Sequence, residues 1–69
     1  MAKIWRNRIE AGTQKLADCP DAYRDDVIAL IRTDLESGKY TEKKLRNLVT
    51  SGMMTAEEYE EITGKPFEV

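Results

Sequence analysis

Two near copies of one phrase in the second half of the chain limit the fold more than any other feature of the sequence. Ser37-Gly38-Lys39-Tyr40-Thr41 returns 14 residues later as Ser51-Gly52-Met53-Met54-Thr55. Glycine readily adopts the left-handed conformation that commonly ends a helix. The threonine hydroxyl can accept a hydrogen bond from a free backbone N–H at the start of the next helix. The repeat therefore predicts two tight corners, each joining the end of one helix to the start of another.

The positions around the corners also fit helix boundaries. Tyr40 and Met54 stand just before the predicted caps, where each can pack as a hydrophobic staple on an apolar residue of the helix that follows. Thr55 and Glu58 have the spacing of a capping box, and Gly64 is expected to end the last helix. The predicted capping residues are Gly38, Thr41, Gly52, Thr55, Glu58 and Gly64.

A longer helix is predicted before the first corner. It opens at Asp18-Cys19-Pro20-Asp21, because proline suits a first turn, where its missing N–H would have had no helical partner. It runs to Ser37. The helices after the corners are too short to be stable alone, so we expect them to pack on this longer one. Its broad apolar face consists of Tyr23, Val27, Ile28, Leu30, Ile31 and Leu35.

A first helix is predicted from about Lys3 to Ala17, weakened or bent at Gly12-Thr13. The fold class that follows is all-α: a small bundle of three to four helices with two tight Gly-x-x-Thr corners, in a single domain over residues 1–69. A core of this size is near the lower limit for independent stability, which makes help from a partner surface plausible. The apolar residues near one side of the first helix are Ile4, Trp5, Ile9 and Leu16.

The chemistry available to the chain is narrow. It has no histidine and only one cysteine, so Ser-His, Cys-His and His-metal sites and internal disulfides are excluded. Cys19 is expected to be a small residue near a helix start rather than a reactive thiol. We expect no enzymatic activity and no cofactor. Four glutamates could attract a divalent cation, but side chains one helical turn apart do not converge into a cage, so a solvated face is favoured for Glu57, Glu58, Glu60 and Glu61.

Charge argues against nucleic acid as a partner. The net charge is −2, and the acidic last helix would be repelled by phosphate, whereas a recognition helix needs basic and amide side chains. The basic residues Lys43, Lys44 and Arg46 are the one contrary feature. Net basic and net acidic blocks alternate along the chain, which favours docking of neighbouring segments within or between chains, although ordinary solvated faces would give the same pattern.

The sequence contains no candidate for membrane insertion. No apolar run reaches the roughly 18 to 20 residues that cross a bilayer. The start of the chain lacks the apolar stretch of a signal peptide, so a cytoplasmic location is expected.

Large apolar and arginine side chains form the hypothetical interaction surface, because such residues are enriched in protein contacts. Trp5 is the favoured contact residue, since it stands where a terminal segment could dock on the acidic helix of a neighbouring chain. The alternative is that Trp5 closes the bundle of its own chain by packing on Val27 or Ile31. The full hypothetical set is Trp5, Arg6, Arg8, Tyr40, Met53, Met54 and Phe67.

Several phrases resemble one family. They are Trp5-Arg6-Asn7-Arg8-Ile9, Gly38-Lys39-Tyr40-Thr41, Val49-Thr50-Ser51-Gly52, Thr55-Ala56-Glu57-Glu58-Tyr59 and Ile62-Thr63-Gly64. Together they resemble the XkdX-like family of small phage and prophage proteins. The resemblance is good over residues 35–67 and loose over residues 4–9, and the segment between them is longer than the family pattern. A weaker similarity is to short C-terminal oligomerisation domains, which share the phrase Gly-x-Ile-Thr-x-Glu-Glu-Tyr.

The resemblance implies a phage or prophage origin, among virion or tail-region genes, and brings no catalytic residues. The expected function is a structural or protein-interaction module, in the cytoplasm of the host bacterium or associated with the virion. Its partner is expected to be a protein: a second copy in a homo-oligomer, or another phage or host protein. The first alternative is a small regulator that occludes a host factor, and the second is a nucleic-acid-binding helical module.

Overall fold

The computed structural model describes residues 1–67, and over that range it is all-helical, which confirms the predicted fold class. Four α-helices and one short 3-10 helix follow each other without any strand in the described part. Helix α2 is by far the longest, with 17 residues against 9, 9 and 8 for the others. The elements are α1 (Ala2–Glu10), η1 (Leu16–Asp18), α2 (Asp21–Ser37), α3 (Glu42–Thr50) and α4 (Ala56–Thr63).

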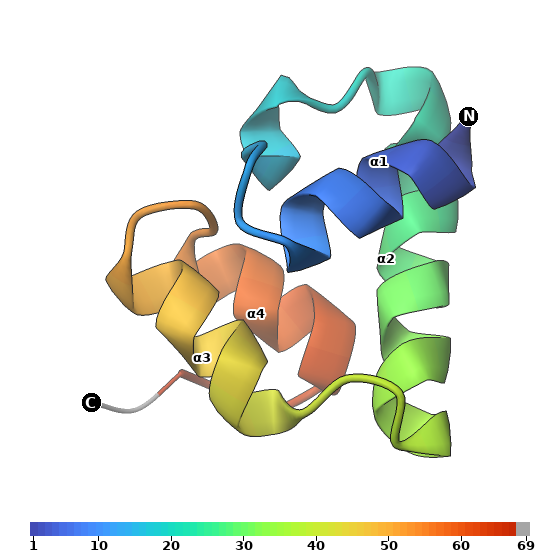
Figure 1. Cartoon of the computed structure of the whole chain (residues 1–69). Coiled ribbons are helices and arrows are strands. Elements are labelled where there is room, and N and C mark those ends of the chain that lie inside the picture. The colour runs from blue at the N-terminus through green and yellow to red at the C-terminus, as the bar shows by residue number, and fades with distance from the viewer. Residues whose placement is uncertain (68–69) are drawn as a thin grey trace.

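Helix α2 is the element on which the bundle is built. In Figure 1 it stands upright at the right, α1 crosses its upper part, and α3 and α4 lie together at the lower left. Helix α1 packs on α2, α4 packs on α2, and α3 packs on α4. The short helices therefore reach α2 directly or through one neighbour, as expected for helices too short to be stable alone.

One apolar core joins all of these elements. Trp5 of α1 and Leu35 of α2 pack against its edge. Every helix contributes at least one fully buried side chain, so no helix can be removed without opening the core. The fully buried residues are Ile9, Leu16, Val27, Ile31, Leu45, Tyr59 and Ile62.

The two copies of the repeated phrase form two similar corners. Gly38 and Gly52 adopt the left-handed conformation, with φ of 82° and 85°. The hydroxyl of Thr41 accepts a hydrogen bond from Lys44 N, and that of Thr55 accepts one from Glu58 N. At the second corner the Glu58 carboxylate accepts a bond from Thr55 N, which completes a capping box, and Gly64 ends α4 in the left-handed conformation.

The end of the first helix is a correction to the sequence prediction. Helix α1 stops at Glu10 rather than near Ala17, because Gly12 turns the chain with φ of 76° and Thr13 N donates back to the carbonyl of Arg8. The segment that follows is held by the tertiary structure, since Leu16 N donates to the carbonyl of Met53 at the second corner. That long-range bond is not visible in a local pattern.

The difference between the two caps yields a stability prediction. Thr55→Ala removes one bond of a capping box, whereas Thr41→Ala removes a single cap bond. We expect both substitutions to lower the free energy of unfolding by about 0.5 to 2 kcal/mol, with the larger loss for Thr55→Ala. Urea unfolding of the two variants beside the parent measures the difference. Equal stability of all three proteins would contradict the capping roles.

Candidate functional site

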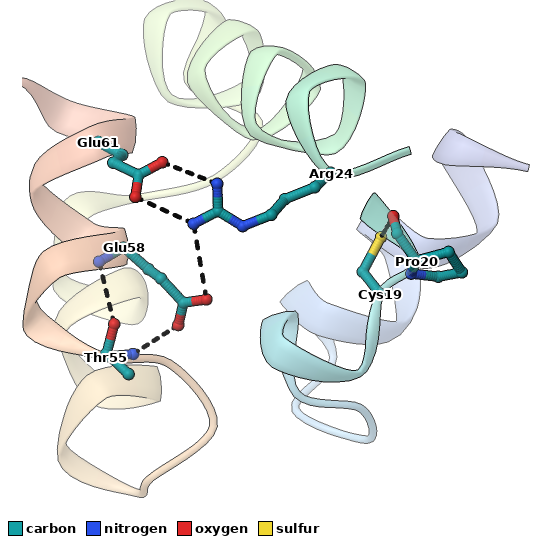
Figure 2. Close-up of polar contacts among 6 residues, drawn as sticks. All are labelled: Cys19, Pro20, Arg24, Thr55, Glu58 and Glu61. Carbon is teal, nitrogen blue, oxygen red and sulfur yellow. Dashed lines mark hydrogen bonds and ion pairs between the residues drawn. The ribbon is translucent and has the colours of Figure 1, made fainter. Parts of the chain in front are cut away.

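A polar network joins Arg24 of α2 to Glu58 and Glu61 of α4 (Figure 2). The guanidinium of Arg24 donates two hydrogen bonds of 3.0 Å to the two carboxylate oxygens of Glu61 and lies 4.0 Å from Glu58. These bonds lower the pKa of Glu61 and raise that of Arg24. Because Glu58 also accepts a bond of 2.8 Å from Thr55 N, the network connects the α4 cap to α2.

A second arginine of α2 holds the other end of α4. Arg32 Nε donates to the carbonyl of Ile62 at 2.9 Å, and its Nη2 donates to the carbonyl of Glu61. Carbonyls in the last turn of a helix have no helical partner, and the negative end of the helix dipole attracts a cation. Arg32 therefore satisfies the C-terminal end of α4, a role that sequence analysis did not detect.

Two carboxyl groups meet between α1 and α2. Asp34 is 5% exposed and pairs with Arg6, whose Nη1 lies 3.2 Å from Oδ2 of Asp34. Glu10 lies beside this pair, and its Oε2 is buried without a hydrogen-bond partner. Burial, together with the neighbouring Asp34 carboxyl, raises the pKa of Glu10 to about 7, and Arg6 partly opposes the shift. Glu10 therefore keeps its proton at mildly acidic pH.

Two of the hypothetical contact residues belong to the core. Tyr40 is 8% exposed and Met54 is 3% exposed, since both precede their caps as the staple position requires. The hydroxyl of Tyr40 also donates to the carbonyl of Glu10 at 3.2 Å, which ties the first corner to the end of α1. Their placement on a contact surface is thus corrected: they hold the corners together.

The remaining hypothetical contact residues lie at the edge of the core or on the surface. Trp5 is half-buried against the core, in agreement with the internal alternative, and the exposed Arg8 lies over its ring at 5.7 Å. Met53 is half-buried at the second corner. Arg6 pairs with Asp34 of α2 in its own chain. At this residue the N-terminal segment therefore contacts the acidic helix of the same chain rather than that of a neighbouring chain.

The last residue of the hypothetical set, Phe67, contacts α3 and α4. Phe67 meets the ring of Tyr59 edge-on at 5.2 Å, and Arg46 lies over the ring of Phe67.

The large apolar side chains that are exposed do not belong to the hypothetical contact set. Met1 and Ile4 are 66% and 47% exposed, although the sequence pattern placed Ile4 with Trp5 and Ile9. The inner side of α1 carries Ala2, Trp5 and Ile9, three and four residues apart, and Ile4 lies outside that stripe. The sequence signal for this was the i, i+3, i+7 spacing of the inner residues, from which Ile4 is displaced around the helix.

Cys19 is not an accessible nucleophile. It is buried, its thiol lies 3.6 Å from the carbonyl oxygen of Pro20, and burial raises its pKa (Figure 2). Within residues 1–67 no three histidine, cysteine or acidic side chains are grouped as a metal site would require. None of the helices in that range combines the length and apolar character needed to cross a membrane.

Comparison with known proteins identifies the family. The model of the family described as Phage uncharacterised protein (Phage_XkdX) matches residues 30–67, more than half of the chain. The chain belongs to the Phage_XkdX family. No curated protein and no solved structure matches it. The family match contains both corners, α3 and α4 and the end of α2, and it does not include the loosely similar segment 4–9.

The acid pair between α1 and α2 gives a pH-dependent prediction. The pKa of Glu10 is about 7 in the folded protein against an ordinary value of 4.5. The folded state therefore binds this proton more tightly than the unfolded state does. The stabilisation that results is complete below the ordinary pKa of 4.5 and is lost as the pH rises through 7. We expect this group to lower the free energy of unfolding by about 1 to 2 kcal/mol between about pH 5 and pH 8. Glu10→Gln should remove this dependence and be more stable than the parent at the higher pH.

Chemical unfolding at several pH values measures this effect. Glu36→Gln is the matched control, because Glu36 is an exposed acid of α2 and should keep the pH dependence of the parent. A Glu10→Gln variant whose stability follows the parent at every pH would show that Glu10 titrates normally in the folded protein.

Proposed function

We propose that this member of the Phage_XkdX family is a non-catalytic protein-interaction module associated with the phage particle, in its tail region. The observation that carries the proposal is that arginine side chains are paired within the fold while large apolar side chains are exposed. Arg6, Arg24 and Arg32 pair with acids or carbonyls of neighbouring helices, so they hold the fold together. The apolar residues Met1 and Ile4 remain exposed, and exposed apolar side chains are typical of contact surfaces when they gather in one place.

The state of the reactive side chains supports a role without catalysis. A nucleophilic cysteine must be accessible and have a lowered pKa. Cys19 is buried and its pKa is raised. Glu10 has a pKa suited to proton transfer, but it lies between α1 and α2 beside Asp34, where its shift is explained by the packing of the two helices.

The distribution of charge supports a protein rather than a nucleic acid as the partner. Lys43 and Lys44 are exposed on α3, but α3 packs on α4, whose exposed residues include Glu57 and Glu60. Phosphate binding gains from every cation near the backbone and loses from every nearby anion. The mixed surface should therefore bind duplex DNA weakly at physiological salt.

The location in the particle is the first prediction of this proposal. Phage particles purified from producing cells should contain the protein at a constant ratio to the tail proteins, measured by quantitative mass spectrometry. Particles from a phage with the gene deleted are the control. Absence from the particles, with recovery in a stable complex with a host protein, would overturn the structural proposal and favour the occluding regulator.

Binding to nucleic acid is tested separately. A fluorescence titration with duplex DNA should show no saturation below about 100 µM protein at physiological salt, where non-specific DNA-binding proteins already bind. Tight binding with a steep dependence on salt would contradict the proposal and favour the nucleic-acid-binding alternative.

A further inference from the structure

Helix α1 crosses the upper part of α2 (Figure 1), and side chains of both helices line a groove between them. Its floor is largely apolar, with Ala2 on one helix and Ala29 and Leu30 on the other. Ile4 does not line the groove but follows Lys3 in α1, about 100° further around the helix, so an apolar projection and an apolar groove occur on the same short helix. The groove is lined by Met1, Ala2, Lys3, Asp26, Ala29, Leu30 and Thr33.

Two opposite charges stand on the two helices that form the groove. Lys3 belongs to α1 and Asp26 to α2, and both are exposed. Neither side chain has an ion pair or a hydrogen bond within the described residues, whereas the neighbouring Arg6 and Arg24 both have acidic partners. A partner for this groove should therefore bring an acid to Lys3 and a base to Asp26.

We propose that the groove binds a second copy of the chain in a two-fold arrangement. The α1 helix of each copy lies in the α1–α2 groove of the other, Ile4 packs on Ala29 and Leu30 of the second copy, and Lys3 pairs with Asp26 across the interface. This assignment rests on the proposed function, because it names the partner and the surface of the interaction module.

The arrangement of charge favours a second copy over an unrelated protein. A two-fold interface uses the same surface on both partners, so that surface must be complementary to itself. A groove with a base on one wall and an acid on the other meets this condition, since the rotation brings each charge opposite its counterpart. The apolar projection and the apolar groove meet it in the same way. The contact area is small, so the dimer should be weak, with a dissociation constant of about 100 µM.

Charge reversal tests this proposal through complementation. Lys3→Glu leaves two acids at the groove and Asp26→Lys leaves two bases, so each variant alone should raise the dissociation constant about tenfold. An equal mixture of the two variants should associate as the parent does, because each copy now supplies the charge that the other requires. Analytical ultracentrifugation from about 10 µM to about 1 mM covers the expected range. Lys15→Glu and Glu36→Lys make the same changes of net charge away from the groove and should leave association unchanged.

Folding is checked in every variant by its thermal melt, which should match the parent because both groove charges are exposed and unpaired. Ile4→Asp should also abolish association while retaining the melt, since Ile4 is half-exposed in the monomer. A parent that stays monomeric at the highest concentration, or single variants that the mixture does not rescue, would overturn the proposal. A monomer that is nevertheless present in phage particles would overturn this dimer and leave the interaction module standing.

Discussion

Burial of one side of α2 is the contact on which the other helices depend. Helices α1, α3 and α4 have 9, 9 and 8 residues, below the length at which an isolated helix is stable in water. Val27 and Ile31 of α2 are fully buried in the core that all helices share. The two arginines of α2 add a directional element to this contact, because Arg24 binds carboxylates of α4 and Arg32 binds its last carbonyls. Apolar burial thus brings α4 to α2, and the guanidinium groups fix where along α2 it lies.

The repeated corners do more than connect helices. The first corner is tied to the end of α1 through the hydroxyl of Tyr40 and the carbonyl of Glu10. The second corner is tied to the segment between α1 and α2, because Leu16 N donates a hydrogen bond to the carbonyl of Met53. Both corners therefore bind the stretch where α1 ends and the chain turns towards α2. This is why a motif that looks purely local in sequence also determines the position of an element far away along the chain.

Local chemistry could be predicted from the sequence, and long-range contacts could not. The corner glycines and the Thr55–Glu58 capping box require only residues within a few positions of each other, so their pattern is sufficient. The end of α1 was misplaced because it depends on the left-handed Gly12 and on a bond from Leu16 to the second corner. The buried pairing of Asp34 with Arg6 joins residues 28 positions apart, and no periodicity indicates it.

The inner stripe of α1 determines which of its surfaces is free. Ala2, Trp5 and Ile9 pack on the core, Leu16 is buried separately after the turn at Gly12, and Ile4 stays exposed on the helix that forms one wall of the α1–α2 groove. Most of that groove comes from residues before Leu30, where the family match begins. The matched region builds α3, α4 and both corners, whose apolar residues Leu45, Met54 and Tyr59 are buried in the core. In the proposed dimer, the family region would supply the scaffold and the segment that precedes it most of the contact surface.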